Sequence, residues 1–264
     1  MSYVLSYAKQ EMGADYDFRL FKFPDQLDQA LREQTPAALC FSNYSWNFEL
    51  AYKFASLAKE RAPELITVFG GPNFPTDIGE KERFLKRRAA IDFYVELEGE
   101  FGFVDLIRKL EPIGRNAQIF KERGETALNT CYVHSGTLVT GPVERIRDLD
   151  MVPSPYLTGT LDEFFELPLI PMMETTRGCP FSCSFCADGI LAKNKVARYH
   201  NQRVIEELQY VAERARDVEE LIITDLNFAM YQQDLDTAQA IAKIQETYNY
   251  PKLVSASAGK NKPK

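Results

Sequence analysis

Three of the five cysteines of this 264-residue chain, Cys179, Cys183 and Cys186, lie in one short stretch. Their C-x-x-x-C-x-x-C spacing allows a single loop to direct three thiolates toward a common centre, which suits a metal cluster. A structural zinc site normally has four protein ligands, whereas a [4Fe-4S] cluster bound by three cysteines leaves one iron open. We therefore expect an iron–sulfur cluster at these cysteines, with one coordination position left for a further molecule.

The residues around these cysteines also favour a cluster. Gly178 and Pro180 shape a tight approach to the first cysteine, and the small side chains of Ser182 and Ser184 leave room for iron and sulfide against the backbone. Thiolates suit iron, and loop N–H groups that donate to sulfur would tune the reduction potential.

Two other kinds of site have the same ligand type: a structural zinc loop and a ferredoxin-like electron carrier. Zinc would need a fourth ligand, but the only nearby histidine, His200, precedes a predicted helix at no recognisable zinc spacing. His134 is expected to be a surface strand residue. Cys40 and Cys131 lie apart in strand-like segments, where buried or incidental thiols are the default. The odd cysteine count fits metal ligation in a reducing cytosol better than a disulfide framework.

The elements around the loop predict an α/β unit. An apolar strand over 167–175 leads into the cysteines, and a second strand ends in Asp225-Leu226-Asn227-Phe228. The elements predicted after the cysteine loop are a helix over 204–215, a strand over 221–224, a helix over 235–248 and a strand over 252–256. Three strands cannot close a (β/α) barrel, so we expect a partial barrel and a chain that is cut short. Lys260 and Asn261 follow the last strand and are expected at the same mouth.

The first part of the chain predicts a Rossmann-like (flavodoxin-like) parallel sheet, because strands alternate with helices. Ligands in such sheets bind beyond the carboxyl ends of the strands, here at Ser42 to Asn47, Gly70 to Asn73 and Glu98 to Glu100. The alternative is that Gly70-Gly71 and Gly99 are only tight turns. The expected strands are 17–23, 37–41, 65–69 and 91–95, and the expected helices are 2–12, 25–33, 49–61, 79–88 and one ending at 110.

Three regions follow from these patterns. Residues 1–112 are expected to form the Rossmann-like domain and residues 166–264 the first part of the barrel. Residues 113–165 are expected to be a connector that is irregular over 111–130 and carries a hairpin over 130–140 with Ser135-Gly136 at its turn. The proline-punctuated stretch 148–156 is the expected linker.

Composition limits the partners. The net charge is -7 and no basic stripe is present, which argues against binding to a nucleic-acid backbone. No apolar run reaches the roughly 20 residues of a spanning helix, and the N-terminus has no signal-peptide pattern. We expect a soluble, cytoplasmic protein that binds neither nucleic acid nor membrane.

The cysteine loop resembles that of the radical S-adenosylmethionine enzymes, with Phe185 just before the last cysteine and an apolar strand before the loop. In that family the open iron binds the amino and carboxylate groups of S-adenosylmethionine, and one electron splits the sulfonium to give a 5'-deoxyadenosyl radical. The resemblance implies that Phe185 meets the adenine. The family's Gly-Gly-Glu is replaced here by Thr224-Asp225-Leu226-Asn227, so Asp225 and Asn227 are expected to contact S-adenosylmethionine. Asp225 as a helix N-cap or turn residue is the alternative, and Arg177 either pairs with an anion or is simply exposed.

The N-terminal part resembles the cobalamin-binding domain of many radical S-adenosylmethionine enzymes, in FSNYSWN, VFGGPN and VELEGE, and RIRDLDMVPSPYLTGTLDEFF resembles their joining segment. The D-x-H-x-x-G motif that ligates cobalt in many such domains is absent, as is the first strand that would precede it. Cobalamin, if bound, would then have no histidine ligand from this chain. The residues implied for the cobalamin face are Ser42, Ser45, Gly70, Gly71, Glu98 and Glu100.

Taken together, the resemblance implies an enzyme that uses a [4Fe-4S] cluster, S-adenosylmethionine and cobalamin for radical chemistry, often methyl transfer to an unactivated carbon. Its partners would be small-molecule cofactors, an unnamed substrate and a reductant such as flavodoxin or ferredoxin. The alternative is a truncated, catalytically inactive protein that only binds a cluster or cofactor.

Overall fold

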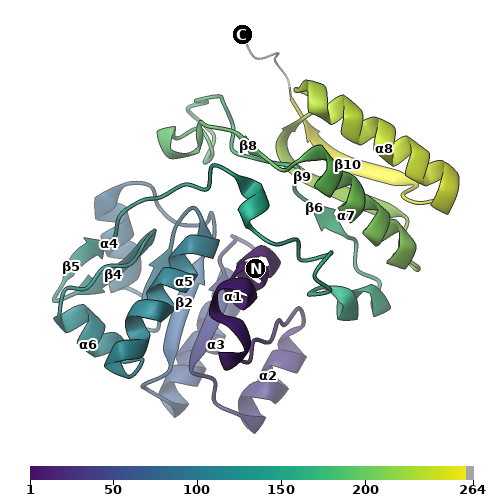
Figure 1. Ribbon diagram of the computed structural model, residues 1–264. Helices are drawn as coiled ribbons and strands as arrows, with labels where there is room; N and C mark the ends of the chain where they lie inside the picture. Colours follow the sequence, from purple (N-terminus) through teal and green to yellow (C-terminus); the bar gives the residue numbers. More distant parts are fainter. Residues whose placement is uncertain (260–264) are drawn as a thin grey trace. The chain divides into compact units, whose positions relative to one another are not determined.

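The computed structural model describes residues 1–259. Within it, the chain divides into two compact units, with the boundary between Arg145 and Ile146 (Figure 1). Each unit is built from strands and helices that alternate along the chain, as the sequence predicts. Lys260 and Asn261, expected at the mouth of the partial barrel, lie outside the described residues.

The first unit contains a five-stranded mixed sheet in the order β1-β2-β3-β4-β5. The first three strands are parallel and the last two add in antiparallel fashion. The strands are β1 (Ala38–Ser42), β2 (Ile66–Gly70), β3 (Phe93–Val95), β4 (Thr130–His134) and β5 (Thr137–Thr140). The hairpin expected in a separate connector is thus part of this sheet, because β4 pairs with the free edge of β3.

Helices cover both faces of this sheet. They are α1 (Ser2–Met12), α2 (Pro24–Glu33), α3 (Phe48–Arg61), α4 (Ile78–Lys86), α5 (Gly99–Leu110) and α6 (Ala117–Glu122), with short 3-10 turns η1 (Gly13–Asp15) and η2 (Glu111–Ile113). Two of them begin at a side-chain cap: Asp77 accepts from the N–H of Glu80 at 3.0 Å, and Asn116 from that of Ile119 at 2.9 Å. The sequence did not predict α6, which lies in the polar stretch expected to be irregular.

Alternation along the central strands divides the core between the two faces. Val68, Phe93 and Val95 point to a cluster completed by α5 and α6, whereas Phe69 and Tyr94 point to one completed by α3 and α4. Successive strand residues face opposite sides of a sheet, so an uninterrupted apolar strand must be covered on both. This explains why the short runs 65–69 and 91–95 were recognisable as buried strands.

The segment 17–23, expected to be a strand from its alternating DFRLFKF pattern, is not one. None of the described strands forms a ladder with it, and β1, at the edge of the sheet, pairs with β2 alone. Its apolar residues instead line a cavity, described below.

The second unit contains a parallel sheet in the order β10-β9-β6 and a separate antiparallel ribbon, β7 with β8. The strands are β6 (Met172–Met173), β7 (Thr176–Arg177), β8 (Ala197–Arg198), β9 (Glu220–Phe228) and β10 (Leu253–Ala258). The helices are α7 (Asn201–Arg214) and α8 (Gln232–Tyr248), with 3-10 turns η3 (Leu149–Met151), η4 (Asp162–Glu166) and η5 (Leu191–Lys193). The α/β class expected for this part of the chain is confirmed.

Two strands of this unit differ in length from the prediction. The strand expected over 167–175 is reduced to β6, because Pro168 and Pro171 have no N–H to donate to a ladder. Strand β9 extends through Asp225 and Asn227, which were expected just beyond it. No helix in the described part of the chain is both long and apolar enough to cross a membrane.

Candidate functional site

The cysteine loop is closed at its base by the β7–β8 ribbon. Thr176 pairs with Arg198, and the N–H of Cys179 donates to the carbonyl of Lys193 at 2.9 Å. Gly178 makes this closure possible: its φ is +108°, and a Cβ there would lie 2.4 Å from the carbonyl oxygen of Lys195. Any larger residue would separate the two sides of the loop, so the glycine before the first cysteine is required by the backbone geometry.

The three cysteines lie on this loop as free thiols. Cys179 is half-buried, whereas Cys183 and Cys186 are exposed and joined by a turn in which the N–H of Cys186 donates to the carbonyl of Cys183 at 3.1 Å. Within residues 1–259, no group of three or more cysteine, histidine or acidic side chains converges to hold a metal ion. The donor chemistry nevertheless fits a cluster with one open iron, because three unpaired thiols share one loop.

The remaining two cysteines have different environments. Burial raises the pKa of the Cys40 thiol to about 12 and also raises that of the Cys131 thiol. The thiolate is the form that binds metals, and these two groups stay protonated at neutral pH. The expectation of buried thiols at both positions agrees with the structure, since Cys131 is buried and Cys40 is partly buried against the core.

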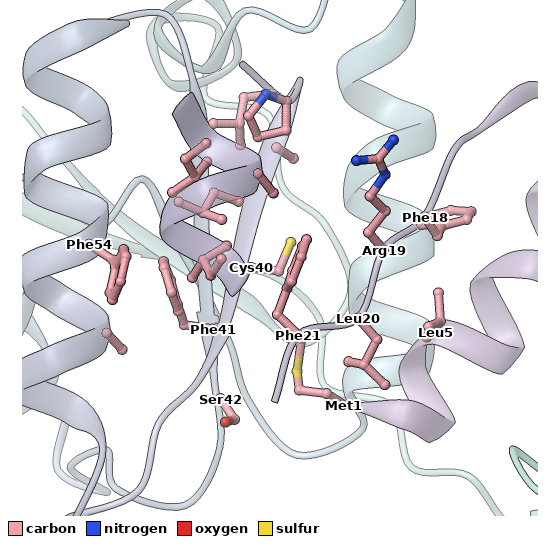
Figure 2. Close-up of a pocket in the computed structure, with 18 of the residues that line it drawn as sticks. Met1, Leu5, Phe18, Arg19, Leu20, Phe21, Cys40, Phe41, Ser42 and Phe54 are labelled. Atoms are coloured by element: carbon pink, nitrogen blue, oxygen red, sulfur yellow. The ribbon is translucent and has the colours of Figure 1, made fainter. Parts of the chain in front are cut away.

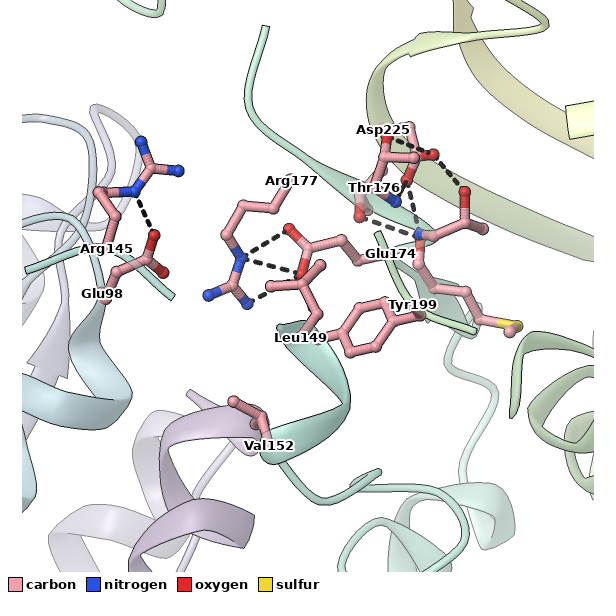
Figure 3. A network of polar contacts seen from close by, with 12 residues as sticks. Glu98, Arg145, Leu149, Val152, Glu174, Thr176, Arg177, Tyr199 and Asp225 are labelled. Carbon is pink, nitrogen blue, oxygen red and sulfur yellow. Dashed lines mark hydrogen bonds and ion pairs between the residues drawn. The ribbon is translucent and has the colours of Figure 1, made fainter. Parts of the chain in front are cut away.

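Asp225, expected to contact S-adenosylmethionine, lies in strand β9 with a buried carboxylate (Figure 3). The carboxylate accepts the N–H of Thr175 at 2.7 Å, the N–H of Thr176 at 3.1 Å and the Thr176 hydroxyl at 2.9 Å; the Thr175 hydroxyl donates as well. Burial raises the pKa of Asp225, and these hydrogen bonds oppose the rise. Asp225 therefore fixes the backbone that leads into the cysteine loop.

The other two predicted contacts to S-adenosylmethionine lie in different surroundings. Asn227 is half-buried, and its side-chain amide donates to the Sγ of Cys179 at 3.1 Å. Phe185 is 92% exposed on the loop. A contact of either residue with S-adenosylmethionine stays a prediction.

Arg177 is not simply an exposed arginine. Its guanidinium forms an ion pair with Glu174 at 2.9 Å (Figure 3), and the hydroxyl of Tyr199 donates to Glu174 at 3.5 Å. This group holds the strand before the loop against the strand after it. The partner of Arg177 was not predicted from the sequence, although the i,i+3 spacing of opposite charges at Glu174 and Arg177 is a signal for such a pair.

In the first unit, the predicted loops meet at one edge of the sheet. Ser42 is the register partner of Gly70, and Gly70 that of Val95, so β1, β2 and β3 end at the same level. Ser42 is half-buried and Ser45 is exposed. The side chain of Asn47 donates to the hydroxyl of Ser42 at 3.1 Å, which ties the loop after β1 back to its strand.

A buried asparagine that the sequence analysis did not single out joins these loops. The Nδ2 of Asn43 donates to the carbonyl of Asn73 at 2.7 Å and to the hydroxyl of Tyr94 at 3.0 Å, and that hydroxyl donates to the carbonyl of Gly71 at 2.9 Å. Gly71 has φ +127°, and a Cβ there would lie 2.6 Å from the carbonyl oxygen of Asn43. Gly71 is therefore required for this close approach of two loops.

Glu98 and Glu100, the acidic residues implied for the cobalamin face, are both buried. Glu98 forms an ion pair with Arg145 (Figure 3), and Asn129 donates to its carbonyl at 3.2 Å. Glu100 lies in the first turn of α5 and is 4% exposed. A role in cobalamin binding for Ser42, Ser45, Gly70, Gly71, Glu98 and Glu100 stays a prediction.

An apolar cavity of about 670 Å³ lies in the first unit beneath the segment 16–23. Figure 2 shows Phe18, Leu20 and Phe21 on one side of it and Cys40 and Phe41 of β1 on the other. This cavity was not predicted from the sequence. Its lining is mainly apolar and also includes charged side chains such as Asp17, Arg19 and Lys22.

A scan against models of protein families found no match. Two curated proteins match nearly the whole chain. It is 33% identical over 267 residues to 2-(S-pantetheinyl)-carbapenam-3-carboxylate methyltransferase of Streptantibioticus cattleyicolor. It is 32% identical over 268 residues to the cobalamin-dependent radical SAM methyltransferase TokK of Streptomyces tokunonensis. Each alignment covers 97% of this chain and 37% of the relative, so the chain spans little more than a third of these proteins.

The fold has a counterpart in a solved structure. The radical S-adenosylmethionine methyltransferase TsrM from Kitasatospora setae, with cobalamin and a [4Fe-4S] cluster bound, aligns with a TM-score of 0.63 over 93% of this chain and 48% of that chain. The sequence identity is 13%, so this likeness concerns the fold alone. The curated relatives confirm the resemblance stated from the sequence. Over the part of their length that it spans, this chain is similar to these two methyltransferases, one of which is a cobalamin-dependent radical SAM methyltransferase.

Proposed function

We propose that Cys179, Cys183 and Cys186 hold a [4Fe-4S] cluster through their thiolates, leaving one iron for S-adenosylmethionine. The observation that carries this proposal is the loop itself: three free thiols follow a glycine-shaped closure, in a chain whose relatives include a cobalamin-dependent radical SAM methyltransferase. The other two thiols are kept protonated by burial, so they do not compete for iron.

The residues around the loop would hold the cofactor in place. When bound, the reduced cluster supplies the electron that cleaves S-adenosylmethionine to a 5'-deoxyadenosyl radical. Phe185 is free to pack against the adenine because its ring is exposed, and Asn227 has a second N–H and a carbonyl for the amino-acid part. The Asp225 carboxylate keeps Thr175 and Thr176 in position beneath the loop, and four hydrogen bonds from these two residues occupy its two oxygens.

The first unit is proposed to bind cobalamin at the carboxyl ends of β1, β2 and β3. Ser42, Gly70 and Gly71 lie at or just beyond these strand ends, which is where ligands of other parallel sheets bind. Neither histidine of the chain lies on these loops, so cobalt would have no histidine ligand from the described residues there. The parallel order β10-β9-β6, with α7 and α8 between its strands in sequence, supports our proposal that the second unit is the first part of a (β/α) barrel.

The proposed reaction is methyl transfer to an unactivated carbon, by analogy with the methyltransferases to which the chain is related. The test is anaerobic reconstitution with iron and sulfide, followed by dithionite and S-adenosylmethionine. Release of 5'-deoxyadenosine by the wild-type chain, and its loss in Cys183→Ala, supports the proposal. A reconstituted cluster that never cleaves S-adenosylmethionine contradicts it.

A second candidate is a protein that binds the cluster or a cofactor without turnover. The specific observation in its favour is the buried Asp225 carboxylate, which already accepts four hydrogen bonds from Thr175 and Thr176. The same reconstitution separates the two candidates, because only the enzyme yields 5'-deoxyadenosine.

A further inference from the structure

Within residues 1–259, the side chain of Asn227 lies outside the cysteine loop and forms a hydrogen bond to a predicted cluster ligand. Its Nδ2 lies 3.1 Å from the Sγ of Cys179, within the range of a hydrogen bond to sulfur. Both residues are half-buried, whereas Cys183 and Cys186 are exposed. The contact is therefore partly shielded from water, where a hydrogen bond has the greater electrostatic effect.

Strand geometry explains why this amide reaches the sulfur. Asp225 and Asn227 are two residues apart in β9, so their side chains point to the same side. Asp225 binds Thr175 and Thr176, and Asn227 binds Cys179, three residues further along the neighbouring segment. The four hydrogen bonds of Asp225 fix the register between β9 and this segment, and that register sets the position of the amide.

The chemistry of the contact is directional. A side-chain amide nitrogen can only donate, and a thiolate accepts a hydrogen bond more strongly than a thiol does. Hydrogen bonds to cysteine sulfur are one of the means by which a protein sets the potential of an iron–sulfur cluster. Adding an electron makes the cluster more negative, so a donated N–H stabilises the reduced form more than the oxidised form.

We propose that Asn227 tunes the cluster, raising its reduction potential through the hydrogen bond to Cys179. This inference rests on the proposed function, because it needs a cluster at the three cysteines. Asn227 acts here as a positioning and tuning residue, and the role leaves its remaining polar atoms free for S-adenosylmethionine.

The experiment is a redox titration of the reconstituted full chain, followed by electron paramagnetic resonance of the reduced cluster. Asn227→Leu keeps the approximate volume but removes the donor, and Asn227→Asp replaces the donor with an acceptor. Both variants should shift the midpoint potential to more negative values, with Asn227→Asp shifting further. Gln202→Ala removes an exposed amide of α7, which donates to Glu206, and should leave the midpoint unchanged.

Iron content and circular dichroism equal to the wild type establish that the variants fold and load. An unchanged or more positive midpoint in Asn227→Leu, with the cluster present, contradicts the inference alone. A wild-type chain that assembles no cluster contradicts the proposed function and the inference together, so the two failures are distinguishable.

Discussion

Replacing Asp225 by alanine should destabilise the second unit more than any substitution of an exposed acidic residue. The carboxylate accepts two main-chain N–H groups and two hydroxyls from Thr175 and Thr176, and it is 2% exposed. The hydroxyls can rotate toward other acceptors, but the N–H groups of these two buried threonines cannot. Each buried donor left without a partner costs about 1–3 kcal/mol.

The expected net loss follows from these opposing effects. Two orphaned N–H groups together cost about 2–6 kcal/mol, and removing a buried carboxylate recovers part of its desolvation cost. We therefore expect Asp225→Ala to lower the free energy of unfolding by about 2–4 kcal/mol, a large share of the roughly 5–15 kcal/mol typical of a domain. Asp225→Asn should cost less, because both N–H groups donate to Oδ1, and the side-chain carbonyl oxygen of asparagine can still accept them.

The only tryptophan, Trp46, lies in the first unit, so tryptophan fluorescence would not report on unfolding of the second unit. Hydrogen exchange measured by mass spectrometry is therefore the better assay. Peptides covering 172–177 and 220–228 should exchange faster in Asp225→Ala, while those from β2 and β3 stay unchanged. Urea unfolding followed by circular dichroism gives the free energy. Asp217→Ala, an exposed position of the same unit, is the matched control and should change stability by less than about 0.5 kcal/mol. Equal protection at Thr175 and Thr176 in Asp225→Ala and the control would refute the reasoning.

Three further predictions concern pH, backbone and cobalamin. Burial raises the pKa of Asp225 above its ordinary 3.8, so the folded chain binds more protons than the unfolded chain just above that pH. The stability advantage of wild type over Asp225→Asn should therefore decrease as the pH rises from about 3.8, which urea unfolding at several pH values would measure. An advantage that grows with pH would contradict this sign. Gly71→Ala places a Cβ 2.6 Å from the carbonyl oxygen of Asn43, at a φ of +127°. This substitution should lower the free energy of unfolding by more than about 1 kcal/mol, as measured by thermal unfolding. The loss should clearly exceed that of Gly114→Ala, whose Cβ would meet nothing within 4 Å. Trp46 is 79% exposed in the loop after β1, so hydroxocobalamin bound there should quench its fluorescence. The quenching should saturate with hydroxocobalamin concentration, unlike the quenching of free tryptophan. Quenching no stronger than for free tryptophan would count against cobalamin at this edge of the sheet.

Much of the fold was predictable because the central strands are short apolar runs between polar turns. Residues 65–69 and 91–95 are covered on both faces, so they are mostly apolar without alternation, and such short runs can be recognised in the sequence. The segment 17–23 misled the same reasoning. Its alternation is that of a strand, but whether a strand forms depends on a partner for its hydrogen bonds, and local sequence carries no information about that.

The site was predictable to a lesser degree. The three cysteines are identified by spacing within one loop, which is a local signal. The role of Asp225 depends on Thr175 and Thr176, fifty and forty-nine residues away along the chain, and this pairing exists only once β9 lies beside the segment before the loop. Asn43 is similar, because its partners Asn73 and Tyr94 come from the ends of other strands. Contacts of this kind follow from sheet register, which a single sequence does not specify.

The most direct test of the cluster assignment is the iron and acid-labile sulfide content after anaerobic reconstitution. The wild type and a Cys40→Ala, Cys131→Ala double variant should each bind about four irons per chain, as expected for one [4Fe-4S] cluster. The Cys179→Ala, Cys183→Ala, Cys186→Ala triple variant should bind none and lose the brown chromophore. Iron retained by the triple variant at the wild-type level would contradict the assignment.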